Sequence, residues 1–70
     1  MNNTLLGTHL ATNQPVEIEL IPQEVQYYHS GSNRDWNKLC DSILDRTGIE
    51  IQGQIELEYV IINGNKRVFH

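Results

Sequence analysis

The sequence has few of the features that indicate where in the cell a protein resides. One cysteine among 70 residues cannot form a disulfide within the chain, and a lone cysteine fits a reducing compartment. No charged segment followed by an apolar core begins the sequence, so we expect a cytoplasmic protein. No apolar run approaches the roughly 18 residues that span a bilayer. The longest, residues 59–62, is typical of a strand, so we expect no membrane association.

Catalytic and metal-binding patterns are missing as well. His9, His29 and His70 do not have the spacing of metal ligands, and no second cysteine accompanies them. The sequence has no glycine-rich phosphate loop, no serine nucleophile elbow and no helix-borne zinc motif. Cys40 falls on the apolar side of a predicted helix, so we interpret it as a small buried hydrophobic residue. We therefore predict no enzymatic activity, no metal and no cofactor.

Basic residues are few. Five lysines and arginines stand against nine acidic residues, for a net charge of −4. This balance disfavours binding to nucleic acid over a broad basic surface and predicts a protein partner with a basic surface. Direct nucleic-acid binding is the alternative, and it would require several residues to converge: Arg34, Lys38, Lys66, Arg67 and the pair Tyr27 and Tyr28.

The clearest pattern present is an alternation over residues 49–62. Its apolar positions are Ile49, Ile51, Ile55, Leu57, Tyr59 and Ile61, and the positions between them are Glu50, Gln52, Gln54, Glu56, Glu58 and Val60. A period of two predicts a strand with one apolar and one acidic face. Gly53 interrupts it, either as a bulge or as a break between two strands. Asn63 and Gly64 then predict a hairpin turn into a last strand at residues 66–70.

Earlier in the chain, strands are predicted at residues 4–12 and 16–21, with a turn at residues 13–15 between them. Residues 23–31 are predicted to be a partly packed loop. A helix follows, with Ser32 or Asn33 as its N-cap and Gly48 at its end. The apolar residues on one side of this helix have the helical spacing of three and four residues: Trp36, Leu39, Cys40, Ile43 and Leu44.

These elements predict one domain over residues 1–70. The expected fold is α+β, a two-layer sandwich in which one helix packs on one face of an antiparallel sheet of four or five strands, in the order ββαββ. This order resembles that of the β-grasp folds, which include ubiquitin and small sulfur carriers. Those carriers act through a C-terminal Gly-Gly tail, whereas this chain ends Val68, Phe69, His70. A role in conjugation or sulfur transfer therefore does not carry over.

The acidic sheet face is the first candidate for a partner-binding site, with Glu17, Glu19, Glu56 and Glu58, and the alternation also allows Glu50 to join it. One interpretation is a solvated face. The other is a regular array of negative charge that occupies a basic groove. The leading hypothesis is a small protein-binding module that inhibits or regulates a nucleic-acid-handling complex. An alternative is an assembly subunit that pairs through an exposed strand edge.

Two apolar features complete the candidates. Both faces become apolar at residues 59–62, which indicates either a strand buried on both sides or a homodimer contact through Val60 and Ile62. A dimer would add burial to a domain that hides only about 60% of its unfolded surface. Tyr27 and Tyr28, followed by His29, form either a contact patch or a cap over the core edge. With Arg34 they could also stack a base.

Overall fold

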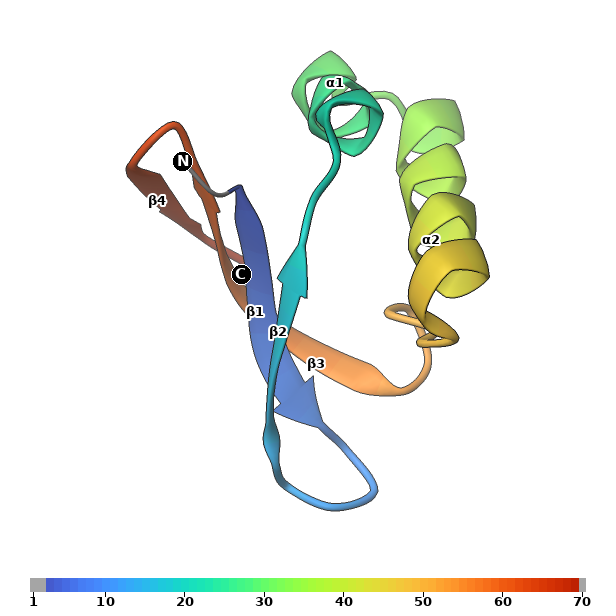
Figure 1. Cartoon of the computed structure of the whole chain (residues 1–70), viewed down its shortest axis with the longest axis vertical. Helices are drawn as coiled ribbons and strands as arrows, with labels where there is room; N and C mark the ends of the chain where they lie inside the picture. The colour runs from blue at the N-terminus through green and yellow to red at the C-terminus, as the bar shows by residue number, and fades with distance from the viewer. Residues whose placement is uncertain (1–2, 70) are drawn as a thin grey trace.

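The computed structural model describes residues 3–69, which form one four-stranded antiparallel sheet and two helices (Figure 1). The sheet order is β2-β1-β3-β4. The predicted α+β class is confirmed, but two helices follow β2, so the order is ββααββ. It therefore departs from the single-helix order that suggested the β-grasp comparison. The elements are β1 Thr4–His9, β2 Pro15–Glu19, α1 Pro22–Ser30, α2 Asn33–Thr47, β3 Ile55–Ile62 and β4 Asn65–Val68.

Helix α1 corrects the predicted loop at residues 23–31. Pro22 occupies its first position, where a missing backbone N–H costs nothing. Glu24 reaches back and accepts a hydrogen bond from the N–H of Ile21 at 3.1 Å, and Gly31 ends the helix with a φ of 72°. The helix was missed because it is short and its apolar residues form no continuous stripe, so its start and end were the informative signals.

Helix α2 has the predicted caps. The Ser32 hydroxyl accepts a hydrogen bond from the Asp35 N–H at 3.1 Å, and Gly48 closes the helix with a φ of 76°. Leu39, Cys40 and Ile43 are buried, whereas Leu44 is 42% exposed at the edge of the apolar side of α2. The local sequence therefore defined this helix correctly from cap to cap.

The long alternating segment divides differently from either prediction. Strand β3 begins at Ile55, and residues 51–54 form a turn in which the Glu50 carbonyl accepts from the N–H of Gln54 at 2.8 Å. Gly53 therefore lies in a turn, and it neither bulges a strand nor separates two. Ile51, 1% exposed, anchors the turn in the core.

A β-bulge lies within β3 itself. Leu6 of β1 pairs with Tyr59 and Gly7 pairs with Leu57, so Glu58 has no partner across β1. One extra residue exchanges the faces of everything that follows it. Tyr59 and Ile61 consequently leave the face of Ile55, contrary to the prediction.

Val60 and Ile62 take their place in the core, at 1% and 6% exposure. The predicted dimer contact is therefore wrong for these two residues, because both are covered within the protomer. The other alternative, a strand buried on both sides, is not confirmed either, because Tyr59 and Ile61 on the opposite face stay partly exposed.

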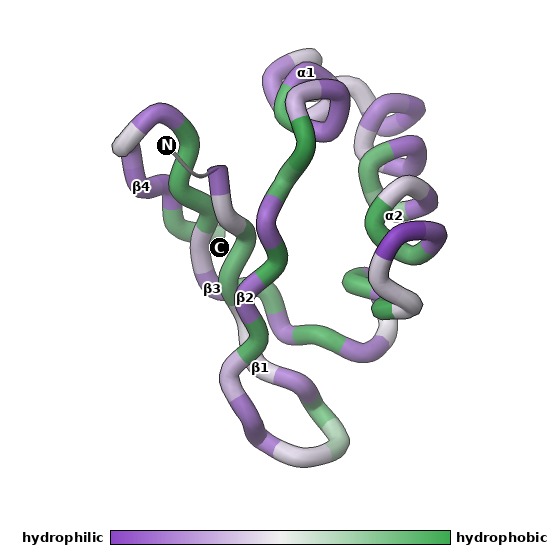
Figure 2. The backbone as a smooth tube through the Cα atoms, viewed as in Figure 1, coloured by the Kyte–Doolittle hydropathy of each residue, from purple (hydrophilic) through white to green (hydrophobic). Residues whose placement is uncertain are grey.

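The core joins one sheet face to the helices. Val60 pairs with Leu5, and Leu5 pairs with Ile18, so these three share a face. In Figure 2 the hydrophobic positions of α2 gather on the side toward the sheet. None of the helices in residues 3–69 has both the length and the apolar character needed to cross a membrane. The buried core residues are Leu5, Ile18, Leu20, Leu39, Cys40, Ile43, Ile51, Ile55, Val60 and Ile62.

Candidate functional site: the open face of the sheet

The strand register assigns each residue to one of two faces. The covered face contains Leu5 and Val60 and lies toward both helices, on the same side of the sheet in Figure 1. We call the opposite side the open face. Its central row runs across all four strands as Glu17, Leu6, Tyr59 and Val68, and the next row runs as Glu19, Thr4, Ile61 and Lys66.

The centre of the open face is apolar. Leu6, Tyr59 and Ile61 are partly exposed, and Val68 is 58% exposed. We call these four residues the apolar stripe. The ammonium group of Lys66 lies 4.3 Å from the centre of the Tyr59 ring, a cation–π distance. The bulge at Glu58 brings Tyr59 and Ile61 to this face, so the apolar stripe exists because of it.

The four predicted carboxylates all lie on the open face and are exposed. Glu17 and Glu19 belong to β2, whereas Glu56 and Glu58 belong to β3, and β1 separates these strands. Since neighbouring strands are about 4.8 Å apart, the two pairs are about 10 Å apart across the sheet. The carboxylates therefore border the apolar stripe and do not form one continuous array.

A shallow groove of about 370 Å³ lies between the two acidic pairs. Leu6 and Tyr59 line it together with Glu17 and Glu58. The Thr8 hydroxyl donates a hydrogen bond to Oε2 of Glu58 at 2.6 Å, which holds that carboxylate beside the groove. An apolar floor between carboxylates is suited to a basic side chain, whose alkyl stem and charged end would each find a complement.

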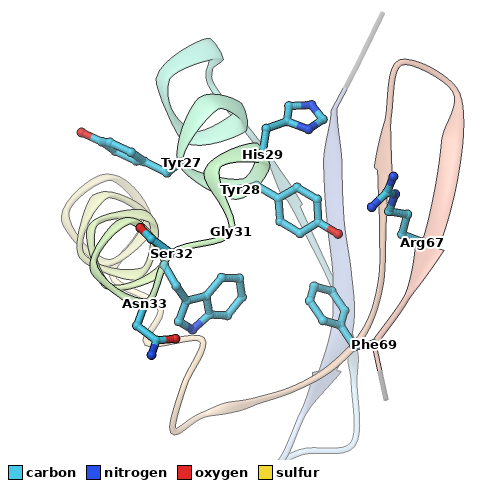
Figure 3. A pocket seen from close by; sticks show the side chains of 9 residues that line it. Tyr27, Tyr28, His29, Gly31, Ser32, Asn33, Arg67 and Phe69 are labelled. Atoms are coloured by element: carbon cyan, nitrogen blue, oxygen red, sulfur yellow. The ribbon is translucent and has the colours of Figure 1, made fainter.

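The predicted tyrosine pair does not join this face. Tyr28 packs on the helix side of the sheet, with its ring centre 6.5 Å from that of Phe69. Tyr27 accepts a hydrogen bond from Gln23 at 2.9 Å and lies 5.9 Å from the Lys38 ammonium group. Figure 3 shows the two tyrosine rings pointing to different sides of α1. The predicted partner-binding set therefore divides between opposite sides of the sheet.

The basic residues required for the nucleic-acid alternative also separate. Lys66 lies on the open face, whereas Arg67, paired with Val60, lies toward the helices. Lys38 is beside Tyr27, and Arg34 lies in the first turn of α2. These residues do not converge into one basic surface.

An ion pair between Arg46, whose side chain is 33% exposed, and the buried Glu24 was not predicted. Glu24 is 0% exposed, and its carboxylate receives both Nε of Arg46 at 2.9 Å and a second guanidinium nitrogen at 2.5 Å. The Ser42 hydroxyl donates to it at 2.5 Å, and Arg46 also donates to the carbonyl of Glu19 at 2.9 Å. The cluster fastens α1 to α2 and to the end of β2. Its one sequence signal was a glutamate at the third position after a helix start.

The ionisation of this pair follows from its contacts. Burial raises the pKa of Glu24, but hydrogen bonds from Arg46, Ser42 and the Ile21 N–H outweigh it, so the pKa lies below its usual value. The hydrogen bonds to Glu24 raise the pKa of Arg46. Both groups are therefore charged at neutral pH, and their role is structural.

Cys40 is buried and unpaired, and the candidate residue His70 lies outside the described residues. Burial, with a smaller contribution from Asp41, raises the pKa of the Cys40 thiol to about 11, so the nucleophilic thiolate is scarce at neutral pH. Within residues 3–69, no three histidine, cysteine or acidic side chains gather as metal ligands would.

Comparisons with protein-family models, with curated proteins and with solved structures found no match. The open face is therefore interpreted from its own geometry. Its features are those of a contact surface: an uncovered apolar stripe, a shallow groove and carboxylates at the border.

Proposed function

We propose that this protein is a protein-binding module whose open face docks on a partner with an apolar patch bordered by basic residues. The observation that supports this is the apolar stripe, which no helix covers and which carboxylates border. An apolar centre within a polar rim is the usual anatomy of a protein interface. In this proposal the fold is two layers, with the helices on one side and the binding face on the other.

The carboxylates determine the class of partner. Glu17 and Glu19 lie on β2, along one edge of the stripe. Glu56 and Glu58 lie on β3, at the end of the stripe nearer the β1–β2 turn. They would steer a basic partner toward the face, and the association would weaken as salt rises. Proteins that handle nucleic acid carry such basic surfaces in their clefts. We therefore propose an inhibitor or regulator of a nucleic-acid-handling complex, acting in the cytoplasm, where a free Cys40 stays reduced.

A strand edge is the second candidate. Strand β4, Asn65–Val68, is the outer strand next to β3, and all four of its residues are exposed. Its unpaired backbone groups could add a strand from a partner, as an assembly subunit would. Such pairing depends on main-chain hydrogen bonds, so it would resist both salt and charge reversal on the open face.

The test compares two charge reversals of equal size. One variant changes Glu17, Glu19 and Glu56 to Lys on the open face, and the control changes Asp41, Asp45 and Glu50, which are exposed elsewhere. Each reversal adds two charges, so three take the net charge from −4 to +2 in both variants. Proteins captured from a cell lysate on each immobilised form are then eluted with rising salt.

The expected result is a basic protein that the wild type and the control retain, that moderate salt releases and that the open-face variant loses. Val68→Asp, on the exposed end of the apolar stripe, should weaken the same capture without altering the fold. Equal capture by all three charge forms would contradict the proposal. Retention in high salt by all of them would instead indicate the β4 edge.

A further inference from the structure

A separate cavity of about 500 Å³ lies on the helix side of the sheet, between α1, the start of α2 and the end of β4 (Figure 3). Its walls include Tyr28, Trp36 and Phe69, with Arg67 at one side. We call it the aromatic pocket. Its volume falls within the range of small-molecule sites, about 300–1,000 Å³.

The aromatic walls are fixed by the fold. The Phe69 N–H donates to the Glu58 carbonyl at 3.0 Å, which continues the β3–β4 pairing one residue beyond the strand and holds Phe69 in place. Its ring centre lies 6.5 Å from Tyr28 and 6.2 Å from Trp36, with interplanar angles of 79° and 58°. All three residues keep part of their surface exposed. Their rings therefore present apolar surface to the cavity at little cost in conformational entropy.

The charge at the pocket is opposite to that of the whole protein. Arg67 lines the aromatic pocket and also a smaller adjoining cavity of about 70 Å³, which shares Tyr28 and His29 with it. No aspartate or glutamate lines either cavity, although the chain carries a net charge of −4. Among residues 3–69, Arg67 takes part in no ion pair. Figure 3 shows its side chain across from the Tyr28 ring.

We propose that the aromatic pocket binds a flat aromatic ligand that carries a phosphate or a carboxylate, with the ring against Tyr28, Trp36 and Phe69 and the anionic group on Arg67. A guanidinium group binds either anion through two parallel hydrogen bonds. Arg67 takes the place that the sequence suggested for Arg34, which does not line the pocket. This site lies on the other side of the sheet from the open face and does not depend on the proposed partner binding.

The single tryptophan provides the measurement. Trp36 is the only one in the sequence and it lines the pocket, so its fluorescence reports occupancy directly. The probes are adenosine monophosphate, which pairs a ring with a phosphate, and phenylacetate, which pairs a ring with a carboxylate. Saturable quenching by one of them is expected, and the probe that binds identifies which combination of ring and anion the pocket accepts.

The variants separate the pocket from general charge effects. Arg67→Gln should weaken binding about tenfold, as expected for losing a charged hydrogen bond. Lys66→Gln removes the same charge one residue away but on the open face, so it should leave the affinity unchanged. Both residues are exposed, and circular dichroism would verify that each variant is folded.

Two outcomes would overturn the proposal. One is the lack of saturable quenching by either probe at millimolar concentration. The other is an equal loss of affinity in Arg67→Gln and Lys66→Gln, which would mean that only the overall charge matters. Weaker binding of adenosine and of ribose 5-phosphate than of adenosine monophosphate would support the joint use of ring and anion.

Discussion

The two faces of the sheet carry similar apolar residues that have different roles. The covered face holds Leu5, Ile18 and Val60 at 4% exposure or less, beneath the helices. The open face holds Leu6, Tyr59 and Ile61, which stay partly exposed beside carboxylates. Apolar side chains on the first face hold the fold together, whereas those on the second are available to a partner. The comparison shows that apolar character alone does not separate core from binding surface in so small a sheet.

The bulge at Glu58 decides which residues belong to which face. Without it, Tyr59 and Ile61 would continue the face of Ile55, and Val60 would lie beside Glu56 and Glu58. With it, the core receives Val60 and Ile62, and the open face receives an aromatic ring and an isoleucine. One unpaired residue therefore creates both the closed core and the apolar stripe.

The largest expected effect comes from breaking the ion pair that fastens α1 to α2 and to the end of β2. Arg46→Ala would leave the buried Glu24 carboxylate without its cation. Because the Arg46 side chain is 33% exposed, we expect a cost of about 3 kcal/mol, the low end of the range for buried pairs. Urea unfolding should show this loss in the free energy of unfolding. Arg34→Ala, an exposed arginine of the same helix, is the control and should change it little. A similar small loss in both variants would show that the ion pair does not hold the helices.

Adjacent isoleucines test the two faces directly. Ile62→Ala empties a site in the core and should lower the free energy of unfolding by about 2–5 kcal/mol. Ile61→Ala removes the same atoms from the open face, where the side chain is partly exposed, and should cost clearly less. Denaturant unfolding of the two variants gives the difference. The opposite ranking would mean that the assigned register of β3 is wrong.

A substitution at Gly7 tests how closely β1 approaches β3 beside the bulge. A Cβ at this position would lie 2.5 Å from the Glu56 carbonyl oxygen and 2.7 Å from the Ile55 side chain, where backbone cannot yield easily. Gly7→Ala should therefore cost about 1–3 kcal/mol, the usual range for overpacking. In Gly53→Ala the close contact is the end of the flexible Glu50 side chain, so that control should cost less. Equal thermal stability of the two variants would contradict the close approach of β1 to β3.

The pH dependence of stability should give a smaller, graded effect. The pKa of Glu24 is lower in the folded protein than its usual value, so its contribution is present above the usual pKa and is lost as pH falls through the folded value. The free energy of unfolding should therefore fall on acidification from neutral pH to about pH 3. In Glu24→Gln this part of the slope should vanish. An unchanged slope would show that other groups govern acid stability.

Much of the fold could be predicted because its signals are local. The caps at Ser32 and Gly48 and the turn at Asn63 and Gly64 depend on residues a few positions apart, and all of them have the predicted role. Asn63 and Gly64 both have positive φ, at 53° and 81°, as the hairpin requires. The acidic residues of the open face also follow from alternation. Their separation by β1 does not, because sequence patterns do not give strand order.

By itself the sequence determined the class of the fold, helix α2 with both ends, the last hairpin and the residues that could carry charge on one sheet face. Each of these follows from the spacing of neighbours along the chain. Only the tertiary structure decided the bulge, the pairing of Glu24 with Arg46 and the meeting of Tyr28 with Phe69, because those partners lie 22 and 41 positions apart or on different strands. Contacts over such distances form when the whole chain packs, and no local pattern records them.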